Sequence, residues 1–353
     1  MAEQQQAANR VRAYRQSRGW TQAELALRAG ISRAAVSAIE VSRLLPSVAA
    51  ALSLARAIGC TVEDLFGLPA QAPGEPEWAW PPQPTSFRCW RATVRGRLWY
   101  YPVEALPAGV LPHDGVFQDG AFASTGDADP QTTLVLACCD PAVNLLTAEY
   151  GRSTGFRLLA LPRSSRQALA LLGQGLVHVA GVHFATREEP DCNRRAVQDT
   201  LGADYCLLRV AHWQEGLALG PGVSVSTIRS ATRARLRWVG REPGSAARQC
   251  LDQLLPNRPA PRRLAHDHRG VAEALRCGWA DIGVCHRLVC EEAGLRFLFI
   301  REEGFDLCFP ASEEGDPRID ALLRVVRSSS YRRVLGELPG YGTAQGGELQ
   351  PIR

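Results

Sequence analysis

A proline-rich stretch near the N-terminus constrains the fold of this chain more than any other feature. Residues 68–84, LPAQAPGEPEWAWPPQP, hold six prolines in seventeen positions. Proline lacks a backbone N–H and fixes φ, so this density excludes regular structure and favours a stiff, extended spacer. With 353 residues the chain is also longer than one typical domain. We therefore expect one folding unit at residues 1–67 and another at 85–353, joined by a linker at 68–84.

The segment before this spacer has the helix start and stop signals of a small all-helical domain. Gly30 and Gly59 stand where helices should end, because glycine readily adopts the left-handed conformation that closes a helix. Hydroxyl side chains that can accept hydrogen bonds from free amides stand at four helix starts, namely Thr21, Ser32, Ser47 and Thr61. The apolar spacing predicts five helices, at residues 9–17, 21–29, 32–40, 48–57 and 61–66.

The third predicted helix is a candidate for reading DNA bases. It follows the second helix through a tight glycine turn, and such a pair presents the N-terminal end of its second helix to the major groove. Arg33 can donate two hydrogen bonds to guanine O6 and N7, whereas hydroxyl and amide groups nearby suit phosphates. Residues 9–43 hold seven arginines and two acids, so the positive charge is local although the net charge is only +4. The candidate DNA-binding residues are Gln22, Ser32, Arg33, Ala34, Ser37 and Arg43.

The motifs of this domain resemble those of the Xre and phage-repressor family of helix-turn-helix domains. The resemblance covers TQAELA, GISRAAVSAIE, RLLPS and LSLARAIGCTVEDLF, and it implies double-stranded DNA as a partner. Ala34 stands where many members carry a polar reader, which suggests a short or shape-assisted site. Because one small domain with a single strong reader binds DNA weakly, we also expect a homodimer on two half-sites.

Beyond residue 130, short strand-like runs alternate with helical patterns. Such alternation predicts an α/β domain with a parallel or mixed sheet covered on both faces. An earlier stretch, RCWRATVRGRLWYYPVEAL, alternates like a β-hairpin. The expected strands are TTLVLACC, FRLLALP, VHVAGVHF, YCLLRVA, RLRWVG, ADIGVC and LRFLFI.

Two segments of this region are similar to each other. GLVHVAGVH (175–183) and GWADIGVCH (278–286) superpose without a gap, with His183 on His286. Junctions between a helix, a glycine and a strand can look alike by chance. The other interpretation is that the domain has two equivalent α/β lobes.

Several polar residues follow predicted strands at the start of a helix. They include Asp140 after LVLACC, Ser164 and Ser165 after LLALP, and Ser245 with Arg248 after RWVG. Helix N-termini offer free amides and a partial positive charge, and the carboxyl ends of parallel strands are where α/β proteins bind ligands. We therefore expect a small-molecule cleft there.

The whole domain resembles a cytoplasmic solute-binding-protein-like domain, related to periplasmic molybdate-binding proteins and often fused behind a helix-turn-helix. CCDPAVNLL, LPRSSRQAL, AHWQEGLALGPG, GREPGSAAR, HRGVAEALRCGWADIGV and LPGYGT carry the resemblance. It implies a bilobal periplasmic-binding-protein-like fold of type II, with one lobe at about 85–210 and 299–345 and the other at about 211–298. The implied ligand-binding residues are Cys139, Asp140, Ser164, Ser165, His183, Asn193, Arg241, Ser245, Arg248 and His268.

Each of these residues also has a purely structural interpretation. Asp140, Ser165 and Ser245 can be simple helix N-caps, His183 a core histidine, and Arg248 a surface residue of its helix. For the ligand itself we expect a small anion. A molybdate-like oxyanion is one option, but Asp140 and Glu242 place carboxylates at the same turns, so an organic anion with an amino or hydroxyl group is another.

The combination predicts a ligand-responsive transcriptional regulator without a cofactor, and not an enzyme. Two alternatives stay open: a metal or redox sensor built on the three His and three Cys of residues 266–290, and an enzyme with Cys139 as nucleophile. Eleven cysteines without a C-x-x-C pair or a secretion signal favour reduced thiols. With no apolar run near the length of a membrane span, we expect a soluble, cytoplasmic protein with no membrane partner.

Overall fold

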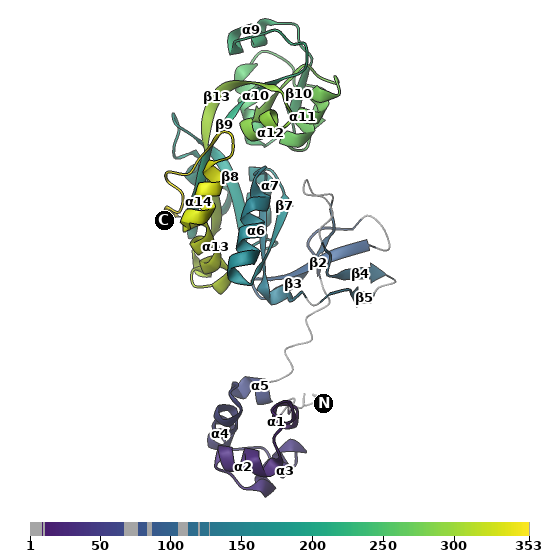
Figure 1. Cartoon of the computed structure of the whole chain (residues 1–353), viewed down its shortest axis with the longest axis vertical. Coiled ribbons are helices and arrows are strands. Elements are labelled where there is room, and N and C mark those ends of the chain that lie inside the picture. Colours follow the sequence, from purple (N-terminus) through teal and green to yellow (C-terminus); the bar gives the residue numbers. More distant parts are fainter. Residues whose placement is uncertain are drawn as a thin grey trace. The chain divides into compact units, whose positions relative to one another are not determined.

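The computed structural model describes residues 9, 11–66, 77–82, 87–104, 112–118, 121–126 and 128–352. They belong to two compact units, Met1–Pro76 and Glu77–Arg353, which are described separately (Figure 1). Of the predicted linker, residues 68–76 and 83–84 lie outside the described residues. Glu77–Trp78, which that prediction also included, form a short strand of the second unit, β1.

The first unit contains the predicted helices, whose ends are set by the expected caps. The side chain of Thr21 accepts from the Glu24 N–H at 3.2 Å, and the Glu24 carboxylate accepts from the Thr21 N–H at 2.6 Å, which completes a capping box. Gly30 closes its helix with φ 65°. Leu25, Val36 and Leu54 are among the core residues. The helices are α1 (Val11–Ser17), α2 (Gln22–Ala29), α3 (Arg33–Glu40), α4 (Val48–Ile58) and α5 (Val62–Phe66).

A buried ion pair joins the first helix to the end of the third. Arg15 donates to both carboxylate oxygens of Glu40, at 2.6 and 3.1 Å, and Gln22 donates to the same carboxylate at 2.9 Å. Burial tends to raise the pKa of Glu40, but the hydrogen bonds from Arg15 and Gln22 outweigh it and hold that pKa below its ordinary value. The carboxylate is therefore charged at neutral pH and fixes α3 against α1 and α2.

The second unit is built on one sheet of ten strands with helices packed against it. The strand order is β11-β10-β12-β9-β13-β8-β6-β7, with β14 and β15 pairing on β9. All seven strands expected from the sequence of this region are present. The strands are β6 (Thr133–Cys138), β7 (Arg157–Pro162), β8 (Val179–Thr186), β9 (Tyr205–Leu219), β10 (Trp238–Arg241), β11 (Arg263–Ala265), β12 (Ile282–His286), β13 (Arg296–Pro310), β14 (Tyr341–Gly342) and β15 (Leu349–Ile352).

Helices alternate with these strands, as the sequence predicts. They are α6 (Val143–Thr154), α7 (Ser165–Gly173), α8 (Cys192–Leu201), α9 (Ile228–Arg233), α10 (Ala246–Leu254), α11 (His268–Arg276), α12 (Arg287–Glu292), α13 (Pro317–Arg327) and α14 (Ser329–Gly336). Within the part of the chain that the structure describes, no helix combines the length and apolar character needed to cross a membrane.

The sheet divides into two lobes of matching topology. In one lobe the parallel strands β7, β6 and β8 are followed by the antiparallel β13, and in the other β11, β10 and β12 are followed by the antiparallel β9. The equivalent strands β8 and β12 carry His183 and His286, so the internal similarity of the sequence corresponds to a structural repeat.

Strands β9 and β13 are each 15 residues long and run through both lobes (Figure 1). The lobe boundaries that we predict, near residues 210 and 299, fall within them. The pairing of β13 with β9 is interrupted by register shifts between Phe299 and Arg301 and between Phe305 and Asp306. Such irregularities bend a strand locally.

A separate five-stranded sheet, antiparallel except for β1, which pairs with β3 in parallel, packs against the first lobe. It has the order β1-β3-β2-β4-β5, with β2 (Phe87–Val94), β3 (Arg97–Pro102), β4 (Gly115–Gln118) and β5 (Ala121–Ser124). The predicted hairpin is present as β2 and β3, turning at Arg95 and Gly96, which both have positive φ. Trp90 and Tyr101 share a core with β6 and β7, and the Tyr101 hydroxyl donates to the Leu176 carbonyl at 2.8 Å.

Asn193 has a different role from the ligand-binding one that the sequence suggests. Its Oδ1 accepts from the N–H groups of Phe184 and Ala185 at 2.5 and 2.9 Å, and its Nδ2 donates to the Gly304 carbonyl at 2.8 Å and to Asp306 at 2.7 Å. The side chain is 1% exposed. All of its hydrogen-bonding capacity is used in joining β8 to β13, so none is left for a ligand.

We predict that Asn193→Ala lowers the free energy of unfolding by about 3 kcal/mol, because it leaves several buried polar groups without a hydrogen-bond partner. Chemical unfolding followed by circular dichroism measures the difference. Asp199→Ala, at an exposed position of the same helix, is the matched control and should leave stability unchanged within about 0.5 kcal/mol. Equal stabilities of the two variants would contradict this role.

Candidate functional site

The N-terminal end of α3 presents the side chains that the sequence nominates for DNA. Ser32, Arg33 and Ala34 are exposed, Ser37 is half-buried, and Arg43 is exposed just beyond the helix. Gln22 is partly committed, because its amide donates to Glu40. Val36 and Ile39 turn towards the core. Contact of these residues with DNA stays a prediction.

A cleft of about 910 Å³ opens where the parallel strands of both lobes end. Cys139, Asp140 and Ser164 line it from the first lobe, and Glu242 and His268 line it from the second. These positions follow β6, β7, β10 and β11 directly or by a few residues. The structure thus brings four of the predicted ligand-binding residues, Cys139, Asp140, Ser164 and His268, to one cavity.

Two histidines of the second lobe point unpaired donors into this region. The Nδ1 atom of His268 accepts from the His286 N–H at 3.2 Å, and the Nδ1 atom of His286 accepts from the Leu288 N–H at 3.0 Å. Burial is the main cause that lowers the pKa of both, to about 3 for His286, so both rings are neutral. A neutral ring that accepts at Nδ1 carries its proton on Nε2, and both Nε2 atoms are buried without a partner.

Other buried donors in the site lack partners as well. The Ser165 hydroxyl makes no hydrogen bond in the structure, and the Ser164 hydroxyl, at the N-cap of α7 in a capping box with Gln167, has no acceptor for its own proton. Neither carboxyl oxygen of Glu215, a residue of β9 that pairs with His286 in the sheet, makes a hydrogen bond. Burial and the nearby Glu303 raise the pKa of Glu215 to about 8, so at neutral pH it is largely protonated and is itself a donor.

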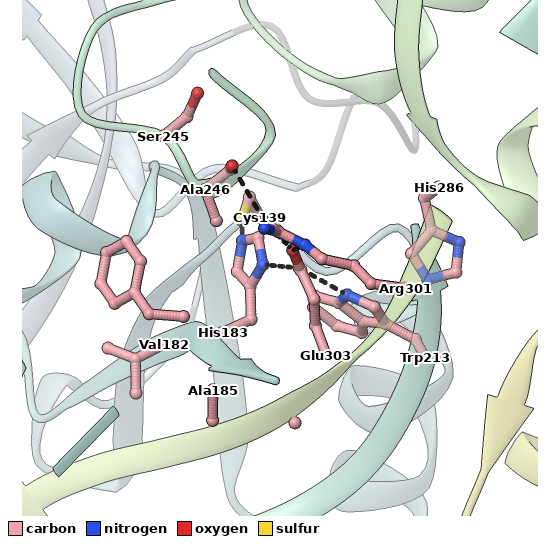
Figure 2. Close-up of polar contacts among 12 residues, drawn as sticks. Cys139, Val182, His183, Ala185, Trp213, Ser245, Ala246, His286, Arg301 and Glu303 are labelled. Atoms are coloured by element: carbon pink, nitrogen blue, oxygen red, sulfur yellow. Dashed lines mark hydrogen bonds and ion pairs between the residues drawn. The ribbon is translucent and has the colours of Figure 1, made fainter. Parts of the chain in front are cut away.

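A charged group lies behind the cleft wall, centred on Glu303 (Figure 2). Its carboxylate accepts from His183 Nδ1 at 2.7 Å, from Trp213 Nε1 at 3.2 Å, and from Arg301 at 2.5 and 2.9 Å. The other ring nitrogen of His183 lies 2.9 Å from Cys139 Sγ. Burial opposes the charge on His183, but Cys139 and Glu303 outweigh it and raise the pKa of His183 well above its ordinary value.

Asp140 and Ser245 are satisfied by the protein itself. Asp140 accepts from the Tyr341 hydroxyl at 2.6 Å and from the Ala142 N–H at 2.9 Å. Ser245 caps α10, accepting from the Arg248 N–H at 3.2 Å and donating to the Glu242 carbonyl at 3.0 Å. The contacts of Ser245 are therefore those of a helix N-cap, the alternative interpretation given above. Asp140, in contrast, holds the C-terminal segment through its hydrogen bond from Tyr341.

Arg248 does not have the position that we predicted for it. Its guanidinium binds Asp252, one turn further along α10, at 2.8 and 3.0 Å. A pair spaced by four residues is typical of a helix surface. The buried cations of the site are Arg241, which pairs with Glu242 at 3.0 and 3.1 Å, and Arg301.

The cysteines and histidines of residues 266–290 do not form a metal centre in the structure. Cys285 and Cys290 are buried, whereas Cys277 is exposed at the end of α11. Across the described ranges, no three His, Cys, Asp or Glu side chains are grouped so that they could hold a metal ion.

Sequence analysis missed several residues of this site: Trp213, Glu215, His286, Arg301, Glu303 and Tyr341. Trp213 links both histidine-bearing strands, with its ring centroid 4.9 Å from that of His183 and 5.1 Å from that of His286. A signal for His286 existed in its alignment with His183. The motifs AHWQEGL and LPGYGT contain Trp213, Glu215 and Tyr341, but nothing local in them indicates burial beside a histidine.

Comparison with known proteins gives matches for both parts of the chain. Residues 147–327, just over half of the chain, match the family model of the PBP superfamily domain, and residues 11–65 match a helix-turn-helix model. The uncharacterized protein YvgK of Bacillus subtilis (strain 168) is 23% identical over 233 residues, which are 63% of this chain and 75% of that protein.

Two solved structures are similar to part of this chain. PhnD1 from Prochlorococcus marinus, in complex with methylphosphonate, has a TM-score of 0.45 at 11% identity and covers 61% of this chain and 93% of its own. A phosphate ABC transporter substrate-binding protein from Clostridium perfringens, with bound phosphate, has a TM-score of 0.46 at 11% identity and covers 59% and 99%.

We predict that Glu215→Gln changes how stability depends on pH. The folded-state pKa of Glu215, about 8, lies above the ordinary value of a glutamate, so the folded protein binds more protons between these two values. Stability of the natural protein should then fall as pH rises through this window, and the glutamine variant should escape that loss. Melting temperatures from pH 5 to 9 measure it, with the exposed Glu302→Gln as control. Parallel pH curves for the natural protein and Glu215→Gln would refute the assignment.

Proposed function

Because this chain belongs to the PBP superfamily and carries a helix-turn-helix domain, we propose that it is a cytoplasmic transcriptional regulator that responds to a small anionic effector in its cleft. Its two domains make it a ligand-binding, DNA-binding regulator. Effector binding closes the two lobes and alters how the chain presents α3 to DNA.

The observation that carries the anionic class is the set of unpaired buried groups. Ser164, Ser165, Glu215, His268 and His286 all lack partners, and at neutral pH each can donate a hydrogen bond. A buried donor without a partner costs about 1–3 kcal/mol. Ser164 and His268 line the cleft, so a ligand with several acceptor oxygens can satisfy both of them, which is the chemistry of a carboxylate or another oxyanion.

The size and charge of the cleft favour an organic anion over a bare oxyanion such as molybdate. A volume of about 910 Å³ suits a small organic molecule. Asp140, Glu242 and Asp267 also line the cleft, and carboxylates disfavour an isolated dianion. An amino or hydroxyl group elsewhere on the effector would add a favourable contact to these carboxylates, which already accept hydrogen bonds from the protein.

We also propose that two copies of the chain bind two half-sites on DNA. One α3 offers a single strong base reader, so one domain alone binds DNA weakly. Helix-turn-helix proteins usually bind more tightly as dimers, with two recognition helices about one turn of DNA apart. Analytical ultracentrifugation with and without operator DNA tests this. A chain that stays monomeric in both conditions would exclude the dimer.

Arg33→Ala should weaken binding to a specific duplex by about 1–3 kcal/mol and relax base preference at one position. Arg43→Ala should weaken specific and random duplexes alike and lower the salt dependence, because a phosphate contact carries no sequence information. Fluorescence anisotropy on both duplexes at several salt concentrations measures this. Identical behaviour of the two variants would remove Arg33 as the base reader.

For the effector, we predict that at least one small organic acid raises the melting temperature in a panel that also contains molybdate, tungstate, sulfate and phosphate. The double variant Ser164→Ala, Ser165→Ala should lose most of that rise. Its melting temperature without ligand should fall slightly, because Ser164 is the N-cap of α7 and loss of a cap costs about 0.5–2 kcal/mol, so the readout is the loss of the ligand-induced rise.

Ser153→Ala, on the exposed face of α6, serves as the control for this experiment. If no anion stabilises the protein, or if the double variant responds as strongly as the natural chain, the proposed effector site is wrong. Stabilisation by divalent metals alone would instead support the metal-sensor alternative.

A further inference from the structure

Cys139 is the one cysteine that the structure places both against the cleft and against a histidine. It is partly exposed and lines the cavity, while its Sγ lies 2.9 Å from His183 Nε2. On the far side of the ring, His183 Nδ1 meets the Glu303 carboxylate at 2.7 Å. A thiol, a base and an acid that orients the base are thus connected in series, although they are far apart in the sequence (Figure 2).

The proton positions in this series follow from the partners. Glu303 is held as a carboxylate by Arg301 and His183, which lower its pKa against the effect of burial. His183 must therefore donate at Nδ1. Its own pKa is raised, so the ring also carries a proton on Nε2, and that proton points at the sulfur. The geometry thus places a hydrogen-bond donor directly against the sulfur, which is how a histidine activates a nucleophilic thiol.

The surrounding charges agree with a thiolate. Arg241 lies close enough to interact electrostatically with Cys139 and adds a second cation. The other ionisable groups facing this pair are Asp140, Glu215, Arg301 and the neutral His268 and His286.

We propose that Cys139 is a nucleophilic thiolate in the cleft wall and that it captures an anionic, aldehyde-bearing effector as a reversible hemithioacetal. The sulfur forms a bond to the carbonyl carbon, the C=O π pair moves to the oxygen, and that oxygen takes the Nε2 proton of His183. Neither an oxidant nor a leaving group is needed. The product is an uncharged hemithioacetal group beside a neutral His183, and the effector's own anionic group keeps its charge.

Addition to a carbonyl fits the site better than a two-cysteine redox cycle. The adjacent Cys138 ends strand β6 with its side chain in the hydrophobic core, 2% exposed. Neighbouring residues joined by a trans peptide have Cα atoms about 3.8 Å apart, closer than the roughly 4.4–6.8 Å that a disulfide spans, so Cys138 is badly placed to form a disulfide with Cys139. The unpaired donors that the effector's anionic group would meet, beginning with Ser164, line the same cleft.

The thiolate is tested on the full-length protein with substoichiometric iodoacetamide and peptide mass spectrometry. An ordinary thiol of pKa near 8.5 is only about 0.3% ionised at pH 6. At pH 6 Cys139 should be alkylated at least tenfold faster than N-acetylcysteine, added as an unperturbed reference thiol, and faster still than the exposed Cys277, whose pKa is raised by its hydrogen bond to Glu273; both ratios should fall as pH approaches 9. His183→Gln should abolish the preference, and Glu303→Gln should reduce it. Equal rates for N-acetylcysteine and for Cys139 in the natural protein would overturn the thiolate, whether or not either variant folds.

The covalent step is tested by protection, and this part rests on the proposed effector site. Glyoxylate, an aldehyde with a carboxylate, should slow alkylation of Cys139 at least fivefold, whereas glycolate, which lacks the carbonyl, should not. Removal of glyoxylate by dialysis should restore the rate. Equal protection by both acids would refute covalent capture but support an anion site. Protection by neither acid would refute capture of an aldehyde. Oxidation of Cys139 by hydrogen peroxide, with no effect of glyoxylate, would refute it as well. Neither result would affect the thermal-shift test of the effector site.

Discussion

The buried carboxylate of Glu303 is the interaction on which the arrangement of the cleft depends. It gathers His183 from β8, Trp213 from β9 and Arg301 from its own strand, and none of its surface is exposed. An unpaired charge at such a position would cost several kcal/mol, so each donor is effectively obligatory. The carboxylate thereby sets the orientation of His183 towards Cys139. It also fixes the indole of Trp213, which stacks on Phe305 at 4.7 Å.

Whether a feature of the fold or of the site can be predicted from the sequence depends on how far apart along the chain its residues lie. The capping box at Thr21 and the strands of the α/β unit are local signals, and the structure contains them. His183 and Glu303, by contrast, are 120 positions apart and meet only because the chain crosses between lobes. The interpretation of Arg248 as a ligand anchor overlooked a local signal. Asp252 stands four residues later, and this spacing favours an ion pair on the helix surface.

The structural repeat shows how one scaffold gives two histidines different chemistry. His183 and His286 occupy equivalent strands, yet His183 faces a carboxylate and is charged, whereas His286 faces a protonated Glu215 and is neutral. The difference lies in the neighbours that the crossing strands supply, since β13 brings Arg301 beside Glu303 and β9 brings no partner to Glu215 among the described residues. One histidine can thus hold a proton near a thiol while the other offers a donor to a ligand.

The two interruptions in the pairing of β13 with β9 give this charge arrangement a mechanical consequence. They fall on either side of Arg301 and Glu303, at the points where bending the sheet breaks the fewest backbone hydrogen bonds. Glu303 pairs with β8 in the first lobe and moves with His183, whereas Arg241 belongs to the second lobe, so rotation of one lobe about these points would change the separation between Arg241 and Cys139. By thermodynamic reciprocity, a change of charge on the sulfur of Cys139 would then shift the equilibrium between open and closed lobes. The degree of closure and the charge on the sulfur are in that case coupled.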